Sequence, residues 1–403
     1  MSKRILLTGG RTFYALELAR LFARQGHEVY LADSVQFPLT RFSNSIAGFI
    51  LVPEPRFAPR EYVSALSNII VEKRIDVCVP IFEEIFYIAW GIERLTPSCM
   101  VWTDTIEKLE VLHNKLTFIE YIKNIGFRTP KTESISSRSK LISCLTRFVC
   151  DKVVLKPAYS RFASRAFIWN RGEAVPISIQ PTETQPWIAQ EFIDGRPVVT
   201  WSVAKGDRVL AHSSYISQQQ WGIGPSMVFE YLKHPNAQKW VEQFVLKTCF
   251  TGQIGFDFIE TEDGILYPIE CNPRGSSGIH LFKGTPEFVE LFLSDKKQQV
   301  VISRGDEIRS IKLWLFVRLC RLIFANQPVS KWKETWQCLS RSIDVLYEKG
   351  DPFPYVGHMI SFAEILFRSM RLRTSPGEVA SRDCDYNGIG EIYNSVKLRY
   401  LKD

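Results

Sequence analysis

The stretch YPIECNPRGSSGIHLF, residues 267–282, runs from a strand-like segment directly into a turn rich in glycine and serine. Glu270, Asn272 and Arg274 stand at alternate positions, and alternate side chains of a strand point to the same side. A carboxylate, an amide and a guanidinium therefore line one face at the end of a strand. The strand that pairs with this one decides what the face can bind.

The preceding segment GQIGFDFI, followed by TEDG at residues 261–264, predicts a β-hairpin. If TEDG forms the connection, Asp257 lies opposite Pro268 and diagonal to Glu270. Asp257, Glu270 and Asn272 then share one face of the hairpin. The other face is apolar and is expected to belong to the core, with Phe256, Phe258, Tyr267, Ile269 and Cys271 on it.

Two carboxylates and an amide oxygen are hard donors, the set that Mg²⁺ prefers, and Mg²⁺ fills its remaining positions with phosphate oxygens and water. Arg274, on the same side, would hold a phosphate. The alternative is a solvated hairpin face with ordinary charges. Upstream lysines favour the metal site: Lys156 ends the apolar strand VVLKP, and Lys115 begins a helix in HNKLTF. Together they predict a clamp for a magnesium nucleotide.

The N-terminal RILLTGG and the helical segment after it predict the opening of a doubly wound α/β domain. Ala15, Leu18, Ala19 and Phe22 recur at helical spacing and would face the sheet. The turn GGRTFYA lacks the G-x-G-x-x-G spacing of a dinucleotide site, which disfavours NAD or FAD. Glu84 follows a buried strand, where it would contact substrate or stabilise a helix N-terminus.

The composition describes a globular protein of 403 residues with room for two to four domains. A net charge of +7 fits an anionic ligand and falls short of a nucleic-acid binder. The nine cysteines form no C-x-x-C pair and indicate reduced thiols, and the N-terminus lacks the pattern of a signal peptide, so we expect a cytoplasmic protein. The apolar segment 311–325 is short and carries three basic residues; it predicts a docked helix, and membrane contact is not expected.

Five motifs in order resemble those of the ATP-grasp ligases: NK at 114–115, VVLKP at 153–157, AQEFIDG at 189–195, GFDFI at 255–259 and IECNPR at 269–274. The resemblance implies a mixed α/β and α+β fold. Its expected parts are a Rossmann-like pre-ATP-grasp domain at 1–105, a small ATP-grasp subdomain at 106–195, a large subdomain with the Mg site at 196–300, and a helix-rich C-terminal extension at 301–403.

The resemblance also implies roles for residues. Lys115 and Lys156 would contact the phosphates of ATP, and Arg274 would serve catalysis by steadying the phosphate that is transferred. Asp257, Glu270 and Asn272 would hold Mg²⁺ or Mn²⁺. The remaining nucleotide contacts would come from the phosphate loop and the adenine-binding segment: Ser160, Ser164, Gln190, Glu191, Phe192 and Ile193. The family's ribose-binding glutamate is missing, since Pro197 or Val198 stands at its position.

The implied reaction activates a carboxylate or an enol with ATP and joins it to an amine or amino acid, releasing ADP and phosphate. Candidate substrate contacts lie in the glycine-rich loops, since their N–H groups bind oxyanions. They are Ser276, Ser277, Gly278 and His280, together with residues 220–226, while Glu84 is a candidate from the end of its strand. The alternative for His280 is a structural role. The motifs are most similar to the mycosporine-glycine synthase branch, whose substrate we do not transfer.

Two rival functions differ in class. One is an NAD-dependent oxidoreductase that uses the N-terminal domain. The other is a non-catalytic ATP-binding or membrane-associated protein that uses the basic C-terminal segment ILFRSMRLR, residues 365–373. The sequence is compatible with a homodimer. It leaves open the acid, the amine and the role of the C-terminal extension.

Overall fold

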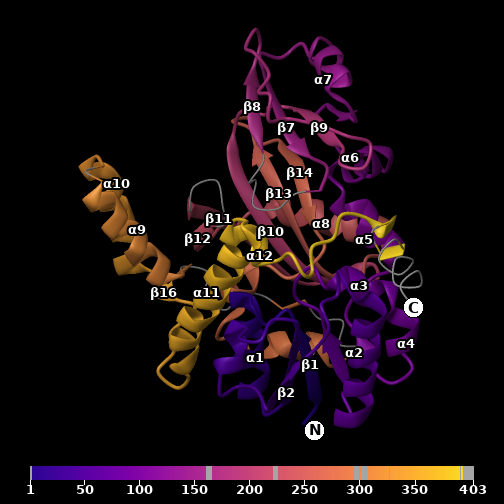
Figure 1. Cartoon of the computed structure of the whole chain (residues 1–403), viewed down its shortest axis with the longest axis vertical. Coiled ribbons are helices and arrows are strands. Elements are labelled where there is room, and N and C mark those ends of the chain that lie inside the picture. Colours follow the sequence, from indigo (N-terminus) through magenta and orange to yellow (C-terminus); the bar gives the residue numbers. More distant parts are fainter. Residues whose placement is uncertain are drawn as a thin grey trace.

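The computed structural model describes residues 2–159, 166–220, 226–294, 299–300, 307–325, 327–390 and 392–393. Figure 1 shows the N-terminal unit at the bottom, a large sheet in the centre, a small sheet at the top and C-terminal helices along one side. The expected combination of an α/β unit with α+β units is confirmed.

The N-terminal unit is a five-stranded parallel sheet in the order β3-β2-β1-β4-β5. Thr12 caps the first helix by accepting a hydrogen bond from the N–H of Ala15 at 3.2 Å. The predicted apolar face of that helix is confirmed, because Ala15, Leu18 and Phe22 are buried against the sheet. The strands are β1 Arg4–Thr8, β2 Glu28–Asp33, β3 Gly48–Leu51, β4 Val77–Val79 and β5 Met100–Val101. The helices are α1 Phe13–Arg24, η1 Leu39–Phe42, α2 Pro59–Lys73, α3 Ile85–Trp90, α4 Ile92–Leu95 and α5 Ile106–His113.

The small sheet is antiparallel, with four strands in the order β6-β9-β7-β8. It has a separate apolar core that includes Leu141, Phe148 and Leu155. Its strands are β6 Thr132–Ile135, β7 Lys152–Pro157, β8 Phe167–Asn170 and β9 Trp187–Glu191, and its helices are α6 Lys115–Asn124 and α7 Arg138–Leu145.

The large sheet has seven strands in the order β14-β13-β10-β11-β12-β15-β16. Two of them, β15 and β16, come from the expected helical extension beyond residue 300. That extension is thus partly built into the central sheet. The strands are β10 Arg196–Lys205, β11 Arg208–Gln220, β12 Ser226–Tyr231, β13 Gly252–Glu260, β14 Leu266–Asn272, β15 Ile308–Ser310 and β16 Ile343–Asp344. Helix α8 Pro235–Thr248 and the 3-10 helices η2 Ser277–Phe282 and η3 Pro286–Phe292 accompany them.

The C-terminal helices are α9 Lys312–Phe324, α10 Val329–Arg341, α11 Phe353–Leu372 and α12 Pro376–Val379. The expected docking of residues 311–325 is only partly right. Within α9 only Leu315 and Leu319 are buried, and Figure 1 shows α9 and α10 extending to the side, away from the N-terminal unit. Among the described residues, no helix is both long and apolar enough to cross a membrane.

Buried ion pairs fasten the C-terminal part to the N-terminal unit. Arg20 of α1 is 1% exposed and donates from Nε to Asp351 at 2.8 Å. Arg11, in the turn after β1, pairs with Asp33 at 2.5 Å and with Asp383 at 2.7 Å. A buried charge without its partner is costly, so these contacts fix the two ends of the chain against each other.

Candidate active site

The hairpin of β13 and β14 forms the floor of the site. Its observed register places Asp257 directly opposite Glu270 and Gly255 opposite Asn272. The expected register, with Asp257 opposite Pro268, is wrong for two reasons. The turn is shifted, since Thr261 donates its N–H to Ile265, and a bulge follows between Asp257 and Phe258. The predicted grouping of Asp257, Glu270 and Asn272 on one face is nevertheless right, because directly paired residues of an antiparallel sheet share a face.

The bulge leaves Ile269 without a partner in the pairing of the two strands. Tyr267 now pairs with Ile259, two positions from Asp257, so it lies on the polar face and not on the apolar face that the sequence predicts. Ile269 is likewise half-buried and outside the core. Its carbonyl oxygen accepts a hydrogen bond from Lys156 Nζ at 3.1 Å. The irregularity thus joins the hairpin to the strand of the small sheet that carries Lys156.

Both predicted lysines reach this face. Lys115 is the first residue of α6, capped by Asn114, and its Nζ lies 3.2 Å from Glu270 Oε1. The N–H of Lys115 donates to the carbonyl of Ala158, just beyond β7, at 3.1 Å. Lys156 lies near the end of β7 and is 7% exposed. The start of α6 and the end of β7 therefore place two buried ammonium groups beside the carboxylates of Asp257 and Glu270.

The electrostatics of these four groups are strongly coupled. Burial raises the pKa of Asp257 to about 7, and the neighbouring Glu270 carboxylate adds to the rise. Burial acts in the same direction on Glu270, but Lys115 and Lys156 outweigh it, so the pKa of Glu270 is lowered. Burial lowers the pKa of Lys156 to about 8 against the opposing effect of Glu270. A site with these shifts is poised for a ligand that brings both negative and positive charge.

Arg274 extends the site toward the N-terminal unit. It donates from Nη2 to Asn272 Oδ1 at 3.2 Å, and its Nε lies 3.6 Å from Glu83 Oε1. The guanidinium also stacks on the ring of Phe82 at 5.2 Å. Nε is buried and makes no hydrogen bond among the described residues, so its charge is balanced by the ion pair with Glu83. Gly275 donates its N–H to the carbonyl of Ile81 at 3.0 Å, so this loop docks on the end of β4.

The donor set fits a divalent cation in part. Asp257 and Glu270 lie opposite each other, and burial together with Glu270 raises the pKa of Asp257. A cation bound between the two carboxylates would favour their charged forms. Asn272 directs its NH₂ group to Asp257 Oδ2 at 3.5 Å, so it would supply an oxygen only with its amide rotated. Among the described residues no cluster of three or more His, Cys, Asp or Glu could hold a metal. Such a site would leave most coordination positions to phosphate oxygens and water.

The predicted adenine segment ends β9. Gln190 is buried and donates from Nε2 to Thr132 Oγ1 at 3.1 Å. Glu191 bonds through both its N–H and its carboxylate to the backbone of Lys131, and the N–H of Phe192 donates to Lys152 at 3.3 Å. These N–H groups are therefore already bonded within the small sheet. An adenine contact through the carbonyl groups or through Ile193 stays a prediction.

Glu84 lies in the loop after β4 and is buried. Its Oε1 accepts hydrogen bonds from Thr8 Oγ1 at 2.6 Å and from the N–H groups of Ile81 and Phe82. Burial raises its pKa. The side chain thus holds the loop before α3 and makes no capping hydrogen bond to the first turn of that helix, so the expected stabilisation of a helix N-terminus takes a different form here. The neighbouring Glu83, which the sequence did not single out as a ligand, is the carboxylate that faces Arg274.

The predicted substrate loop divides into two parts. Ser276 Oγ lies 3.5 Å from the hydroxyl of Tyr215, on the side of Arg274. Gly278 packs so closely on Trp201 that an added Cβ would lie 2.6 Å from Trp201 Cβ. His280 is fully buried and pairs with Glu17 Oε2 of α1 at 3.2 Å, so the role its geometry supports is structural. Ser277 begins η2. Ser160, Ser164 and residues 221–225 of the second loop lie outside the described residues.

Tyrosines complete the lining near Arg274, and sequence patterns offered no signal for them. Tyr14 of α1 lies close enough to Arg274, Glu83 and Glu84 for their charges to act on it, and burial raises its pKa to about 12. Tyr215 is buried beside Ser276. The site therefore lies where the carboxyl ends of the parallel strands meet the hairpin of β13 and β14, the usual position of ligands in such sheets.

The site thus lies where the small antiparallel sheet, through Lys156, meets the β13–β14 hairpin of the large sheet. Residues 112–277 match the family model described as an ATP-grasp domain. This match confirms the resemblance of the motifs to the ATP-grasp ligases in this part of the chain. The finer likeness to the mycosporine-glycine synthase branch is not confirmed.

An uncharacterized protein of Methanocaldococcus jannaschii is 24% identical over 276 residues, which cover 64% of this chain and 64% of that protein. The chain thus spans less than two thirds of the length of that curated relative. Several solved structures share the fold. An N5-carboxyaminoimidazole synthetase from Staphylococcus aureus, complexed with ADP, has 15% identity and a TM-score of 0.55, over 69% of this chain and 72% of its own.

An L-amino acid ligase from Bacillus licheniformis has 16% identity and a TM-score of 0.54, over 72% of this chain and 70% of its own. An N5-carboxyaminoimidazole ribonucleotide synthetase from Thermus thermophilus has 14% identity and a TM-score of 0.57, over 76% of this chain and 81% of its own. At these identities the likeness concerns the fold.

Proposed function

We propose that the protein is an ATP- and Mg²⁺-dependent ligase that activates a carboxylate and joins it to an amine or amino acid. The observation that carries the proposal is the meeting of Lys115 and Lys156 with the opposed carboxylates of Asp257 and Glu270. The match of residues 112–277 to the ATP-grasp domain model supports it, as does the ADP bound to the structurally similar synthetase from Staphylococcus aureus.

In the proposed reaction a substrate carboxylate oxygen attacks the γ-phosphorus of ATP and the bond to ADP breaks. The amine nitrogen then attacks the carbonyl carbon of the acyl phosphate, phosphate leaves, and the nitrogen loses a proton. Lys115 and Lys156 would hold the phosphates, and Arg274 would steady the group that is transferred. Asp257 and Glu270 would hold Mg²⁺, which neutralises phosphate charge when bound. Positioning and charge neutralisation suffice, so no general base is assigned.

The rival dinucleotide site is disfavoured by the turn after β1. There the N–H of Arg11 donates to Asp33 Oδ2 at 3.2 Å, and its guanidinium is bonded to Asp33 and Asp383. In a dinucleotide site, groups of this turn would face the pyrophosphate. The C-terminal segment around Asp383 takes that place. Titration with NAD(H) is expected to show no saturable binding.

The direct test measures ADP and phosphate release from ATP with a panel of carboxylic acids and amines. Release is expected only with a matching acid, and amide formation only when the matching amine is added. Glu270→Ala and Lys156→Ala should each lower kcat/KM by about a hundredfold or more. Glu262→Ala, in the exposed turn of the same hairpin, is the matched control and should retain activity. Unchanged turnover in Glu270→Ala and Lys156→Ala would contradict the assignment of these residues to the active site.

A further inference from the structure

Helix α11 exposes a continuous apolar stripe. Between Phe353 and Met370 no exposed position carries a charge, and the exposed side chains recur every three or four residues along one face. The opposite face is packed: Gly357 meets Phe42 so closely that an added Cβ would lie 2.3 Å from its ring. The large exposed side chains are Phe353, Val356, Met359, Ile360, Leu366, Phe367 and Met370, of which Met370 is 71% exposed.

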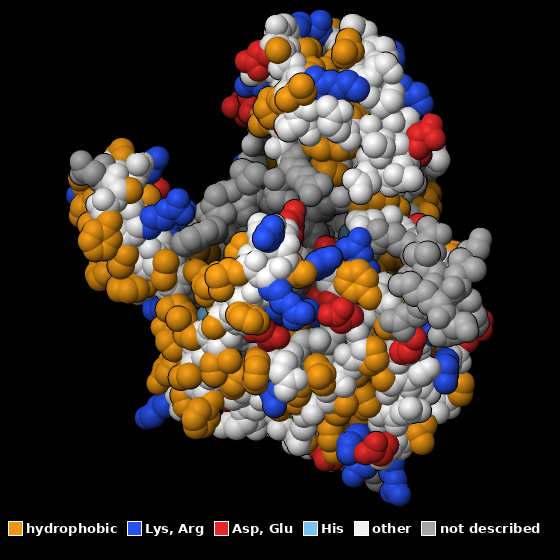
Figure 2. Space-filling view, viewed as in Figure 1, with side chains coloured by type: hydrophobic (Ala, Val, Ile, Leu, Met, Phe, Trp, Pro, Cys, Tyr) orange, Lys and Arg blue, Asp and Glu red, His pale blue; other side chains and the backbone are white. Residues whose placement is uncertain are grey.

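Helices α9 and α10 add a second apolar area. Phe316 and Ile323 of α9 are more than half exposed, Phe324 is 88% exposed, and Trp336 of α10 is 55% exposed. Figure 2 shows hydrophobic side chains over this projecting pair and over the neighbouring flank of the body, on the same side of the molecule. Large contiguous apolar areas are uncommon on soluble monomers and mark contact sites.

The exposed charges on and between these helices are mostly positive. In the described part of residues 311–373, the exposed charged residues include a single acid, Glu334. The exposed basic residues are Arg321, Lys331, Lys333, Arg341, Lys349, Arg371 and Arg373. The surface therefore combines apolar side chains with a basic rim, which is the pattern of elements that lie in the interface of an anionic membrane.

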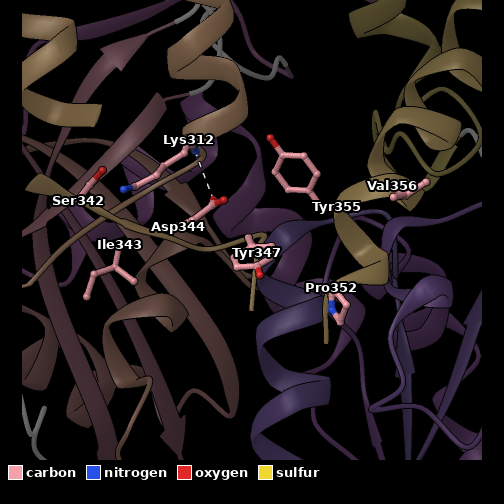
Figure 3. A pocket seen from close by; sticks show the side chains of 8 residues that line it. All are labelled: Lys312, Ser342, Ile343, Asp344, Tyr347, Pro352, Tyr355 and Val356. Atoms are coloured by element: carbon pink, nitrogen blue, oxygen red, sulfur yellow. Dashed lines mark hydrogen bonds between the residues drawn. The ribbon is translucent and has the colours of Figure 1, made fainter. Parts of the chain in front are cut away.

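A cleft of about 820 Å³ opens where α9 leaves the body and α11 begins. Figure 3 shows Tyr347, Tyr355 and Val356 on one side of it and Lys312 on the other, where the N–H of Lys312 donates to Asp344 at 3.3 Å. Tyrosine, with an apolar ring and a polar hydroxyl, suits the boundary between hydrocarbon and water. The cleft lies at the starts of α9 and α11, and we name the two apolar areas together with this cleft the α9–α11 face.

We propose that the α9–α11 face docks the protein on the surface of an anionic lipid bilayer. The exposed apolar side chains enter the interfacial layer, and the basic rim pairs with lipid phosphates. A second copy of the chain is a poorer occupant, because two such faces would bring their basic rims together. The proposal is independent of the ligase reaction, since none of these residues belongs to the candidate active site.

The test is sedimentation of the full chain with vesicles of phosphatidylcholine alone or mixed with phosphatidylglycerol. Binding is expected to the mixed vesicles and to weaken as salt is raised. The double variant Met359→Gln/Phe367→Gln should bind at least about tenfold more weakly. The double variant Lys331→Glu/Lys333→Glu should lose most of the preference for phosphatidylglycerol. Ile142→Gln/Leu246→Gln, which changes exposed apolar residues of α7 and α8, is the matched control and should bind as the parent does.

Light scattering after gel filtration and thermal unfolding accompany each variant, so that loss of binding is separated from loss of folding. Two results would overturn the proposal. One is a folded protein that does not sediment with phosphatidylglycerol-containing vesicles at low salt. The other is a dimer that Met359→Gln/Phe367→Gln dissociates, which would assign the face to a second copy.

Discussion

Asp257 and Glu270 face each other as paired residues of β13 and β14, and burial together with the opposing carboxylate raises the pKa of Asp257 to about 7. In the free protein the native state therefore holds a proton that the unfolded chain releases near pH 4. The free energy of unfolding falls as pH rises through this window, because the native state then binds more protons than the unfolded one. Above this pH window the repulsion between the two carboxylates lowers the free energy of unfolding of the free protein. A bound cation would remove this repulsion.

Asp257→Asn is accordingly expected to stabilise the free protein while abolishing the proposed reaction. The gain should be about 1 to 3 kcal/mol at pH 8 and smaller at pH 5, where the native carboxyl is protonated. Thermal unfolding at the two pH values measures it, and Glu262→Gln in the turn of the hairpin is the control. A variant less stable than the parent at pH 8 would show that the two carboxylates do not repel each other in the free protein.

Nucleotide binding should be coupled to proton uptake at Lys156, whose pKa burial lowers to about 8. Above that pH the free protein has lost the proton, and phosphate contact restores it. Affinity for ATP should then fall by up to about tenfold for each pH unit above 8. Calorimetry at pH 8.5 in buffers of different ionisation enthalpy should detect the uptake in the parent and not in Lys156→Met. Lys152→Met, on the same strand, should keep it.

Glu83 and Glu84 are neighbours with separate expected effects. Glu83→Gln removes the charge beside Arg274 Nε, so kcat should fall about tenfold or more, with little change in thermal stability. Glu83→Asp should restore part of the loss. Glu84→Gln weakens the acceptor for Thr8 and two N–H groups and should lower stability more than kcat. A raised KM for the acid substrate in Glu84→Gln would instead support a direct substrate contact.

Gly195, which connects the small sheet to the large one, has no room for a side chain. A Cβ there would lie 2.2 Å from the carbonyl oxygen of Glu260, and backbone cannot yield as a flexible side chain can. Gly195→Ala should cost about 1 to 3 kcal/mol, measured as a lower midpoint of chemical unfolding. Gly350→Ala is the control, since a Cβ there meets nothing within 4 Å. Equal midpoints for the two variants would contradict the close contact.

The grouping of the charged side chains in the candidate site was largely predictable from short motifs, because each motif is a local element with a local rule. Lys115 starts a helix behind a capping Asn114, and Lys156 lies near the end of an apolar strand. The alternation of strand side chains grouped Asp257 with Glu270 and Asn272. The bulge at Ile269 was not predictable from the turn sequence, and the carbonyl that it leaves unpaired in the hairpin accepts a hydrogen bond from Lys156, more than a hundred positions away in the sequence.

Burial by distant elements accounts for the other differences. His280 stood near the metal strand in the sequence, but its partner Glu17 belongs to α1, and the pair is enclosed between two units. Two adjacent glutamates after β4 could not be told apart, since the direction of each depends on how the loop folds. The exposure of α9 and α11 also escaped prediction, because an apolar helix looks the same in sequence whether or not another element covers it.

The ion pairs of Arg11 and Arg20 bear on the order in which the chain folds. Their acidic partners Asp383 and Asp351 follow 372 and 331 positions later in the sequence. Until those residues are in place, the N-terminal sheet would have to bury two guanidinium groups without these partners. We therefore expect the N-terminal unit to complete its folding only after the segment 351–383 has docked on it.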